Sequence, residues 1–324
     1  YEFSAASNGD QLFLNNGSGQ FTASQNFSKF KDFRSCVKPC DFDLDGDLDL
    51  FLGSRVKAGQ YPLSTPSRIL RNDHGTFTEI SFDDEHQQMV TDAVWVDLNG
   101  DRFPELITVS EWAAPVLYQN TKGKLTRDLK SGLHHLTGWW TRIRSADIDR
   151  DGDLDLAIGN FGLNTKYHAS PKKPALLYYG TVGTSDKKQI IEAEYEDNTL
   201  FPIRGKSCST AAMPNLAKKF DTYHAFALAE LNEIYNLKEA QRFDAKFLES
   251  GFLINDGTGK LTFRPMPRIA QLSPIQGLVF SDLTSNGSPD LIISQNFLNP
   301  QFETGPYSGG FGLMLKNDGQ GNFT

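Results

Sequence analysis

The stretch from Asp41 to Ser54 reads DFDLDGDLDLFLGS, and it decides how the rest of the sequence is interpreted. Its first half alternates carboxylates with other residues and has a glycine at the sixth position, whereas its second half is apolar. Glycine suits a sharp turn because it adopts positive φ without steric cost. A short apolar run bounded by a turn predicts a buried strand. The stretch is therefore an acidic loop that leads directly into a strand.

Two kinds of stretch alternate along the chain. The acidic loop returns as DLNGDRFPELITVS from Asp97, DIDRDGDLDLAIGN from Asp147 and DLTSNGSPDLIISQN from Asp282. The other kind is a hairpin whose turn contains Asn, Asp or Gly, which supply the positive φ angles of tight turns. Its copies are QLFLNNGSGQFT, RILRNDHGTFTEI, VLYQNTKGKLTRD, GFLINDGTGKLTF and GLMLKNDGQGNFT.

One loop and one hairpin together make a unit of roughly 45 to 60 residues, the size of a four-stranded propeller blade. The sequence predicts an all-β fold, a β-propeller of about six such blades, with a range of five to seven, as a single domain over residues 1–324. Each acidic loop would join the first and second strands of a blade, and each hairpin turn the third and fourth. A partial blade is expected at 1–24, and fuller units near 33–80, 89–128, 139–200, 203–264 and 275–324.

The segment from Phe220 to Ser250 interrupts this pattern. It is rich in Ala, Leu, Glu and Lys and contains neither Gly nor Pro, which predicts one or two inserted helices near 220–250. A packing role is expected for them, with partner binding as the alternative. Because the chain begins and ends within repeat-like sequence, we expect it to be a fragment of a longer protein.

The acidic loops are candidate calcium sites. Calcium takes six to eight oxygen ligands, and carboxylates this closely spaced repel one another without a cation. An EF-hand is disfavoured because position 12 of the first loop is Leu52 and a strand follows. We predict two Ca²⁺ sites and a third at Asp97, where Arg102 replaces the turn glycine. The seventh position would contribute its backbone carbonyl. The predicted ligands are Asp41, Asp43, Asp45, Asp47 and Asp49; Asp147, Asp149, Asp151, Asp153 and Asp155; and Asp97, Asn99, Asp101, Phe103 and Glu105.

The loop at Asp282 keeps only one other carboxylate, Asp290, and is expected to be a polar turn whose own hydrogen bonds satisfy it.

Composition excludes several function classes. The net charge of -8 argues against nucleic-acid binding, which depends on Lys and Arg contacts to phosphates. No apolar run of 18 residues occurs, so we expect no membrane insertion. Cys36 and Cys40 lie about 13 Å apart if their segment is a strand, which is too far for a disulfide.

No catalytic motif is recognisable. The sequence lacks G-x-S-x-G, H-E-x-x-H and a P-loop, and its histidines, including the adjacent His134 and His135, accompany no nucleophile motif. We therefore predict no catalytic residues and no enzyme activity. The tryptophans are expected mainly in the core, with sugar stacking as the alternative. They are Trp95, Trp112, Trp139 and Trp140.

The acidic loops, their trailing apolar strands and the sequence GNFG at 159–162 resemble FG-GAP or VCBS repeats, the blades of integrin-α-like propellers. The segments RVKAGQYPLSTPSRILRND, GWWTRIRSADIDRDGDLDLAIGNFGLNTKYHASP and AQLSPIQGLVFSDL are more narrowly similar to the CRTAC1/ASPIC-UnbV type of Bacteroidetes. The resemblance implies the propeller fold and calcium in the loops. This chain departs from it at TVGTSDKKQ, from Thr181, where we predict no calcium.

These observations favour a calcium-binding module that is secreted, on the cell surface or in the periplasm, and that binds an unknown protein or glycan. Two alternatives stay open: a carbohydrate-active enzyme such as a calcium-dependent polysaccharide lyase, and a purely structural module of a surface protein.

Overall fold

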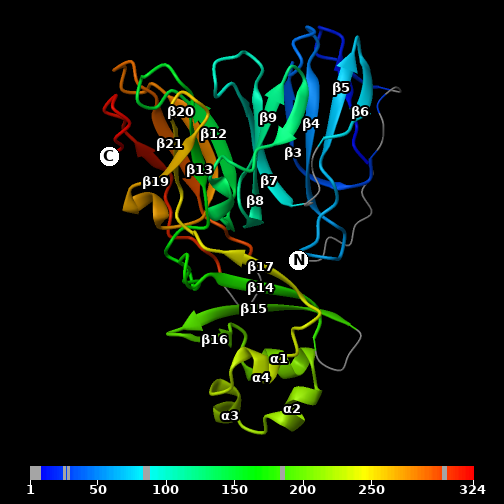
Figure 1. Cartoon of the computed structure of the whole chain (residues 1–324), viewed down its shortest axis with the longest axis vertical. Coiled ribbons are helices and arrows are strands. Elements are labelled where there is room, and N and C mark those ends of the chain that lie inside the picture. The colour runs from blue at the N-terminus through cyan, green and yellow to red at the C-terminus, as the bar shows by residue number, and fades with distance from the viewer. Residues whose placement is uncertain (1–8, 25–26, 28–29, 83–87, 183–186, 301–304) are drawn as a thin grey trace.

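The computed structural model describes residues 9–24, 27, 30–82, 88–182, 187–300 and 305–324. The fold is all-β, as predicted, with antiparallel sheets that follow one another along the chain (Figure 1). One prediction, that the loop after Thr181 lacks calcium, falls largely on residues 183–186, outside the described residues.

Two complete blades follow the predicted order of strands. The first of them contains β3 (Phe33–Cys40), β4 (Asp49–Val56), β5 (Arg68–Asp73) and β6 (Thr76–Ile80). The second contains β7 (Met89–Val96), β8 (Glu105–Ala113), β9 (Val116–Thr121) and β10 (Lys124–Arg127), with β11 (Gly138–Trp139) also paired to β8. In both, the acidic loop joins the first two strands and the Asn- and Gly-containing turn joins the last two, which confirms the predicted connections.

The third blade is split by an insertion. Its first half is β12 (Arg142–Ala146) and β13 (Asp155–Gly159), and its second half is β18 (Gly251–Asn255) and β19 (Leu261–Pro265). These four strands form one sheet in the order β12-β13-β18-β19. The predicted units at 139–200 and 203–264 are therefore wrong. The apolar run at Leu176–Tyr179 looks like the third strand of a blade, but it pairs within a separate sheet.

That separate sheet and four short helices make up the insertion, which lies below the blades in Figure 1. Its strands are β14 (Ala175–Thr181), β15 (Lys188–Glu196), β16 (Thr199–Pro202) and β17 (Gln241–Ala245). Its helices are α1 (Lys206–Ala212), α2 (Asn215–Lys219), α3 (Tyr223–Ala227) and α4 (Leu231–Ile234). The helical part thus lies earlier than the predicted 220–250, because residues 241–245 pair with β14 and this pairing overrides their helix propensity.

Smaller sheets lie at the two ends of the chain. The two-stranded sheet of β1 (Phe13–Asn15) and β2 (Phe21–Ala23) occupies the place of the predicted partial blade. The last sheet contains β20 (Ile275–Ser281), β21 (Asp290–Gln295) and β22 (Leu313–Leu315), and a bridge between Asn317 and Phe323 begins its fourth strand. Within the described residues, three blades thus have four or more strands, and the two terminal sheets have three and two, so the predicted count of about six four-stranded blades stays a prediction.

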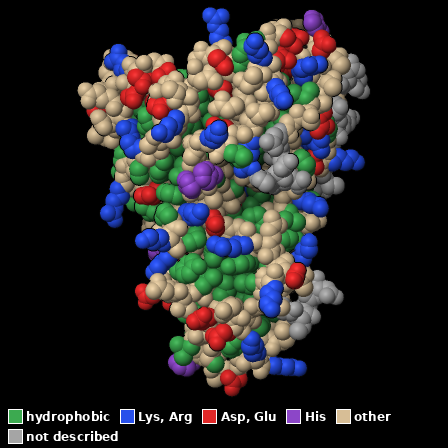
Figure 2. Space-filling model, in the orientation of Figure 1, with side chains coloured by type: hydrophobic (Ala, Val, Ile, Leu, Met, Phe, Trp, Pro, Cys, Tyr) green, Lys and Arg blue, Asp and Glu red, His purple; other side chains and the backbone are tan. Residues whose placement is uncertain are grey.

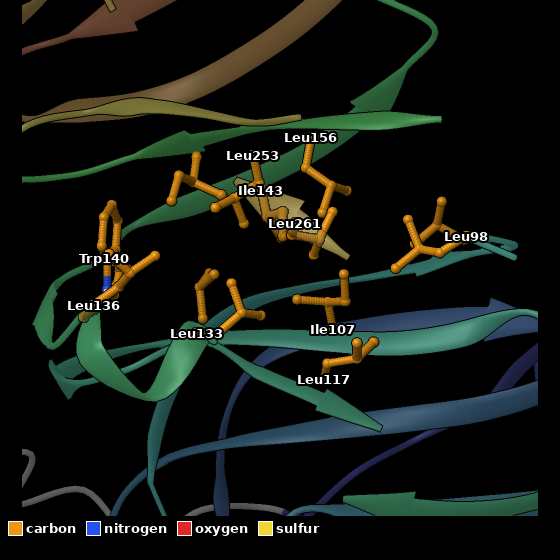
Figure 3. Close-up of a cluster of buried hydrophobic side chains, with 13 residues drawn as sticks. Leu98, Ile107, Leu117, Leu133, Leu136, Trp140, Ile143, Leu156, Leu253 and Leu261 are labelled. Atoms are coloured by element: carbon orange, nitrogen blue, oxygen red, sulfur yellow. The ribbon is translucent and has the colours of Figure 1, made fainter. Parts of the chain in front are cut away.

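The first strands of successive blades are neighbours, with β3 against β7, β7 against β12, and β12 against β20. Apolar side chains fill the spaces between the sheets. Figure 3 shows one such cluster, where Ile107 and Leu117 of the second blade meet Ile143 and Leu253 of the third. This arrangement of blades around their first strands is that of a propeller.

No helix in the described part of the chain is long and apolar enough to cross a membrane. Cys36 and Cys40 are free thiols on β3, as their spacing predicts.

Candidate metal centres

The loop between β3 and β4 brings three carboxylates together. Oxygens of Asp41, Asp43 and Asp49 lie within 4.8 Å of one another. Asp41 shapes the loop by accepting hydrogen bonds from the backbone N–H groups of Asp45 and Gly46, each at 3.1 Å. Asp43 Oδ1 is buried and accepts no hydrogen bond, and burial together with the charge of Asp45 raises the pKa of Asp43. A buried carboxylate oxygen without a donor is a position that a hard cation fits.

The loop between β12 and β13 also gathers three carboxylates, from its first, third and fifth positions rather than its first, third and ninth. Its three gathered carboxylates are those of Asp147, Asp149 and Asp151. Asp147 Oδ1 and Asp149 Oδ1 are both buried without a hydrogen-bond donor. Burial and the neighbouring Asp151 raise the pKa of Asp149. Two loops from different blades therefore present the same kind of oxygen cluster.

Asp45, Asp153 and Asp155 do not join these clusters, and Asp47 groups with Asp73 and His74 instead. Asp45 Oδ1 accepts a hydrogen bond from the N–H of Asp47 at 3.0 Å. Asp151, although it belongs to its cluster, likewise accepts at Oδ1 from the N–H of Asp153 at 3.0 Å. The side chain of Asp47 turns toward the β5–β6 hairpin, where it accepts from the backbone N–H of His74 at 2.9 Å. These side chains shape the loop, whereas the backbone carbonyls of the seventh position stay candidate ligands.

The carboxylate at the ninth position braces each loop against its own blade. Asp49 accepts from the backbone N–H groups of Phe42 and Asn72, and Asp155 from those of Ile148 and Asn255. Burial raises the pKa of Asp49 and of Asp155 to about 6. In Glu105, burial raises the pKa to about 7.

The loop at Asp97 differs in its donor set. Asn99 brings an amide instead of a carboxylate, and its Nδ2 donates to Glu105 Oε1 at 3.2 Å. Asp97 accepts from the N–H groups of Gly100 and Arg102, each at 2.9 Å. Arg102 has a φ of 76°, which is a left-handed conformation. The other loops have a glycine at this position, which adopts that conformation more easily. The structure gathers no trio of carboxylates here among the described residues, so the third calcium site stays a prediction.

The loop at Asp282 satisfies its own polar groups. Thr284 Oγ1 donates to Asp290 Oδ2 at 3.0 Å, and Asn286 Nδ2 donates to the carbonyl of Asn317 at 2.9 Å. Burial alone would raise the pKa of Asp290, but hydrogen bonds from Asn317 and Thr284 hold it below the usual value. This is the hydrogen-bonded polar turn that the sequence predicts.

Sequence reasoning missed an asparagine that links neighbouring loops. Asn120, Asn255 and Asn317 occupy equivalent places at the end of the third strand of their blades. The Nδ2 of each donates to the carbonyl at the second position of the preceding blade's loop: Asn120 to Phe42, Asn255 to Leu98, and Asn317 to Ile148. The recurring Asn in LYQN, LIND and LKND is the signal that could have identified them. The acidic loops are thereby joined in a row.

This row of loops lies at the top of the blades in Figure 1, away from the insertion. The reason is that β13 begins at its acidic loop and leads the chain toward the insertion at its other end. Acidic side chains, in red, are visible at that end in Figure 2.

The tryptophans pack as expected. Trp140 is fully buried, and Trp112 and Trp139 are nearly so. Trp95 is partly buried and stacks on Phe42 with ring centroids 5.5 Å apart. Core packing is therefore the main role of these rings, although Trp139 also lines a pocket.

Comparison with known proteins identifies the repeats. A family model described as the FG-GAP-like repeat matches residues 41–108 and 97–158, which contain the first three acidic loops. No curated protein matches the chain. Among solved structures, the chain is similar to one from a study of an Agrocybe aegerita lectin that recognises non-reducing terminal N-acetylglucosamine, at 12% identity. The match covers 98% of this chain and 73% of the lectin chain, with a TM-score of 0.37. Residues 41–158 of this chain therefore contain FG-GAP-like repeats, and its successive sheets form a β-propeller-like fold.

Proposed function

We propose that the chain is a calcium-stabilised extracellular β-propeller that works as a binding module for a protein or a glycan. One observation carries the calcium part of the proposal. Two loops of different blades each gather three carboxylates, with buried oxygens that accept no hydrogen bond. Calcium bound there would neutralise the repelling charges and join the first and second strands of each blade. Extracellular calcium modules have dissociation constants of about 10⁻⁴ to 10⁻³ M, which suits millimolar surroundings.

Binding rather than catalysis is proposed because the acidic residues belong to metal loops, where a coordinating carboxylate is a poor general base. A polysaccharide lyase would need a base in a cleft beside the calcium. The candidate loops and the pocket lined by Glu111, Trp139 and Arg142 lie at different ends of the blades, which disfavours a calcium-assisted reaction. Turnover of an acidic polysaccharide by the calcium-loaded protein would favour the enzyme instead.

Removal of calcium is expected to lower the melting temperature. With about 5 mM free calcium and the dissociation constants above, each site contributes roughly 1 to 2 kcal/mol. Two sites then correspond to a shift of about 3 to 6 °C for a protein of this size. Differential scanning calorimetry of dialysed protein, with chelator and after calcium is restored, measures this shift. A melt that is the same in both conditions contradicts the calcium proposal.

The size of this shift is expected to depend on pH. Asp49, Asp155 and Glu105 have a raised pKa in the calcium-free fold, about 6 to 7 against about 4 in an unfolded chain. Their contribution to stability is present below pH 4 and is lost as the pH rises through 6 to 7, because the folded state holds the extra protons. Calcium offsets this loss, so its effect on the melting temperature should be larger at pH 7.5 than at pH 5.5. An equal or larger effect at pH 5.5 contradicts the assignment.

A further inference from the structure

A pocket of about 500 Å³ opens at the end of the blades opposite the acidic loops. Each of four successive first strands contributes a lining side chain near its start: Ser35 from β3, Thr91 from β7, Arg142 from β12 and Gln276 from β20. The acidic loops follow the other ends of the same strands. The pocket is therefore separate from the candidate calcium sites and lies where the first strands converge.

One wall of the pocket is a fixed polar cluster. The guanidinium of Arg55 pairs with Glu111 Oε1, and the hydroxyl of Tyr61 donates to Glu111 Oε2 at 3.3 Å. Trp112 Nε1 in turn donates to the Tyr61 oxygen at 2.8 Å. The charge of Glu111 is therefore balanced within the pocket, and its carboxylate is held in one orientation.

Arg142 supplies positive charge that the described residues do not balance. Its Nη1 donates to the backbone carbonyl of Thr141 at 2.7 Å, and it makes no ion pair with a described carboxylate. By contrast, Arg34, which also lines the pocket, is paired with Asp10 and Asp32. A guanidinium binds carboxylates through two parallel hydrogen bonds, and it does so more strongly where water is partly excluded. In a chain of net charge -8, this local positive charge favours an anionic ligand.

The floor of the pocket is apolar and rigid. Trp139 and Phe161 stack with centroids 4.2 Å apart and an interplanar angle of 10°. Both also line a smaller adjoining pocket, to which the insertion contributes Glu192 and Arg204. The site thus lies at the junction of the blades and the insertion, with apolar and hydrogen-bonding walls on different sides.

We propose that this pocket binds a sugar residue that carries a carboxylate, as in a uronic acid oligosaccharide. The carboxylate would pair with Arg142, the hydroxyl groups would bond to Thr91, Gln276 and Glu111, and an apolar sugar face would lie on Trp139. The volume lies within the usual range of about 300 to 1,000 Å³ for small-molecule sites. The inference rests on the proposed role as a binding module, but it does not depend on calcium in the loops.

Isothermal titration calorimetry with a galacturonic acid trisaccharide tests the proposal, with the neutral galactose trisaccharide and a sulfated trisaccharide as comparison ligands. Calcium-loaded and chelated protein are both titrated. We expect the galacturonate to bind at least tenfold more tightly than the neutral sugar in both states. No binding, or equal binding of acidic and neutral sugars, overturns the proposal. Preference for the sulfated sugar alone overturns the assignment of a carboxylate.

The variant Arg142→Gln separates binding from folding. It is expected to weaken galacturonate binding about tenfold without changing the melting temperature, because the side chain makes no described ion pair. Arg127→Gln, a half-buried arginine on the outer strand β10, is the matched control and should bind normally. Unchanged affinity in Arg142→Gln overturns the proposal. Calcium stabilisation without sugar binding would overturn this inference alone, whereas sugar binding without calcium stabilisation would overturn only the calcium part of the proposed function.

Discussion

Replacement of Asn255 by alanine is expected to lower the free energy of unfolding by about 3 kcal/mol. Its Nδ2 donates to the carbonyls of Leu98 and Leu154 at 2.9 and 3.3 Å, and its Oδ1 accepts from the N–H groups of Gly257 and Gly259. The side chain is buried, so alanine leaves several of these backbone groups without a partner, at roughly 1 to 3 kcal/mol for each one left buried and unsatisfied. Urea denaturation followed by circular dichroism measures the loss.

Asn72→Ala is the matched control. Asn72 occupies the equivalent place in the first complete blade, where its Nδ2 donates to the carbonyl of Leu48 in its own loop and makes no bond to another described blade. It is also more exposed than Asn255. We expect Asn72→Ala to cost about 1 kcal/mol. Equal losses in the two variants would show that the bond between blades does not contribute to stability.

Replacement of Asp92 by alanine is expected to cost a similar amount, about 3 kcal/mol. Asp92 lies on β7 and forms ion pairs with Lys38 of β3 and Arg144 of β12, both at 2.6 Å, so it joins three first strands. Its side chain is 5% exposed. Removal of one partner of a buried ion pair costs about 3 to 5 kcal/mol, and the partial exposure of Lys38 and Arg144 places this case at the lower end.

The pH dependence of Asp92→Ala gives an independent readout. Burial would raise the pKa of Asp92, but Lys38 and Arg144 hold it below the usual value. A lowered pKa contributes stability above about pH 4 that is lost as the pH falls through the folded value. The stability difference between wild type and variant should therefore shrink below pH 4. Glu79→Gln, which removes a surface partner of Arg68, is the control and should cost less than about 1 kcal/mol. Equal losses in the two variants would contradict the role given to Asp92.

The blade plan could be predicted because it depends on local patterns. The turn residues around Gly46 and Gly152 and the apolar runs that follow them each specify a loop and a strand within a few residues. The split of the third blade could not be predicted in this way. Leu156 pairs with Leu253, almost a hundred residues later, and neither strand encodes the identity of its distant partner. Residues 241–245 illustrate the same limit, since β14 supplies the pairing that makes them a strand.

The candidate calcium sites could be predicted only in part, because the conformation of each loop decides which carboxylates meet. The spacing of Asp41, Asp43 and Asp45 indicates crowded carboxylates, but spacing does not tell which ones converge. In the structure Asp45 bonds to the loop backbone, while Asp49 returns to the cluster from the start of the next strand. The pocket at Arg142 has no sequence motif, because its walls come from strands that are separated along the chain.

Direct measurement of bound calcium tests the central claim. Equilibrium dialysis at millimolar calcium should find at least two ions per chain for wild type. Asp41→Asn and Asp147→Asn should each remove one. Asp282→Asn should remove none, although Asp282, like Asp41, accepts from the N–H groups four and five residues further along. Wild-type protein that binds no calcium, or binding that neither Asp41→Asn nor Asp147→Asn reduces, would contradict the account.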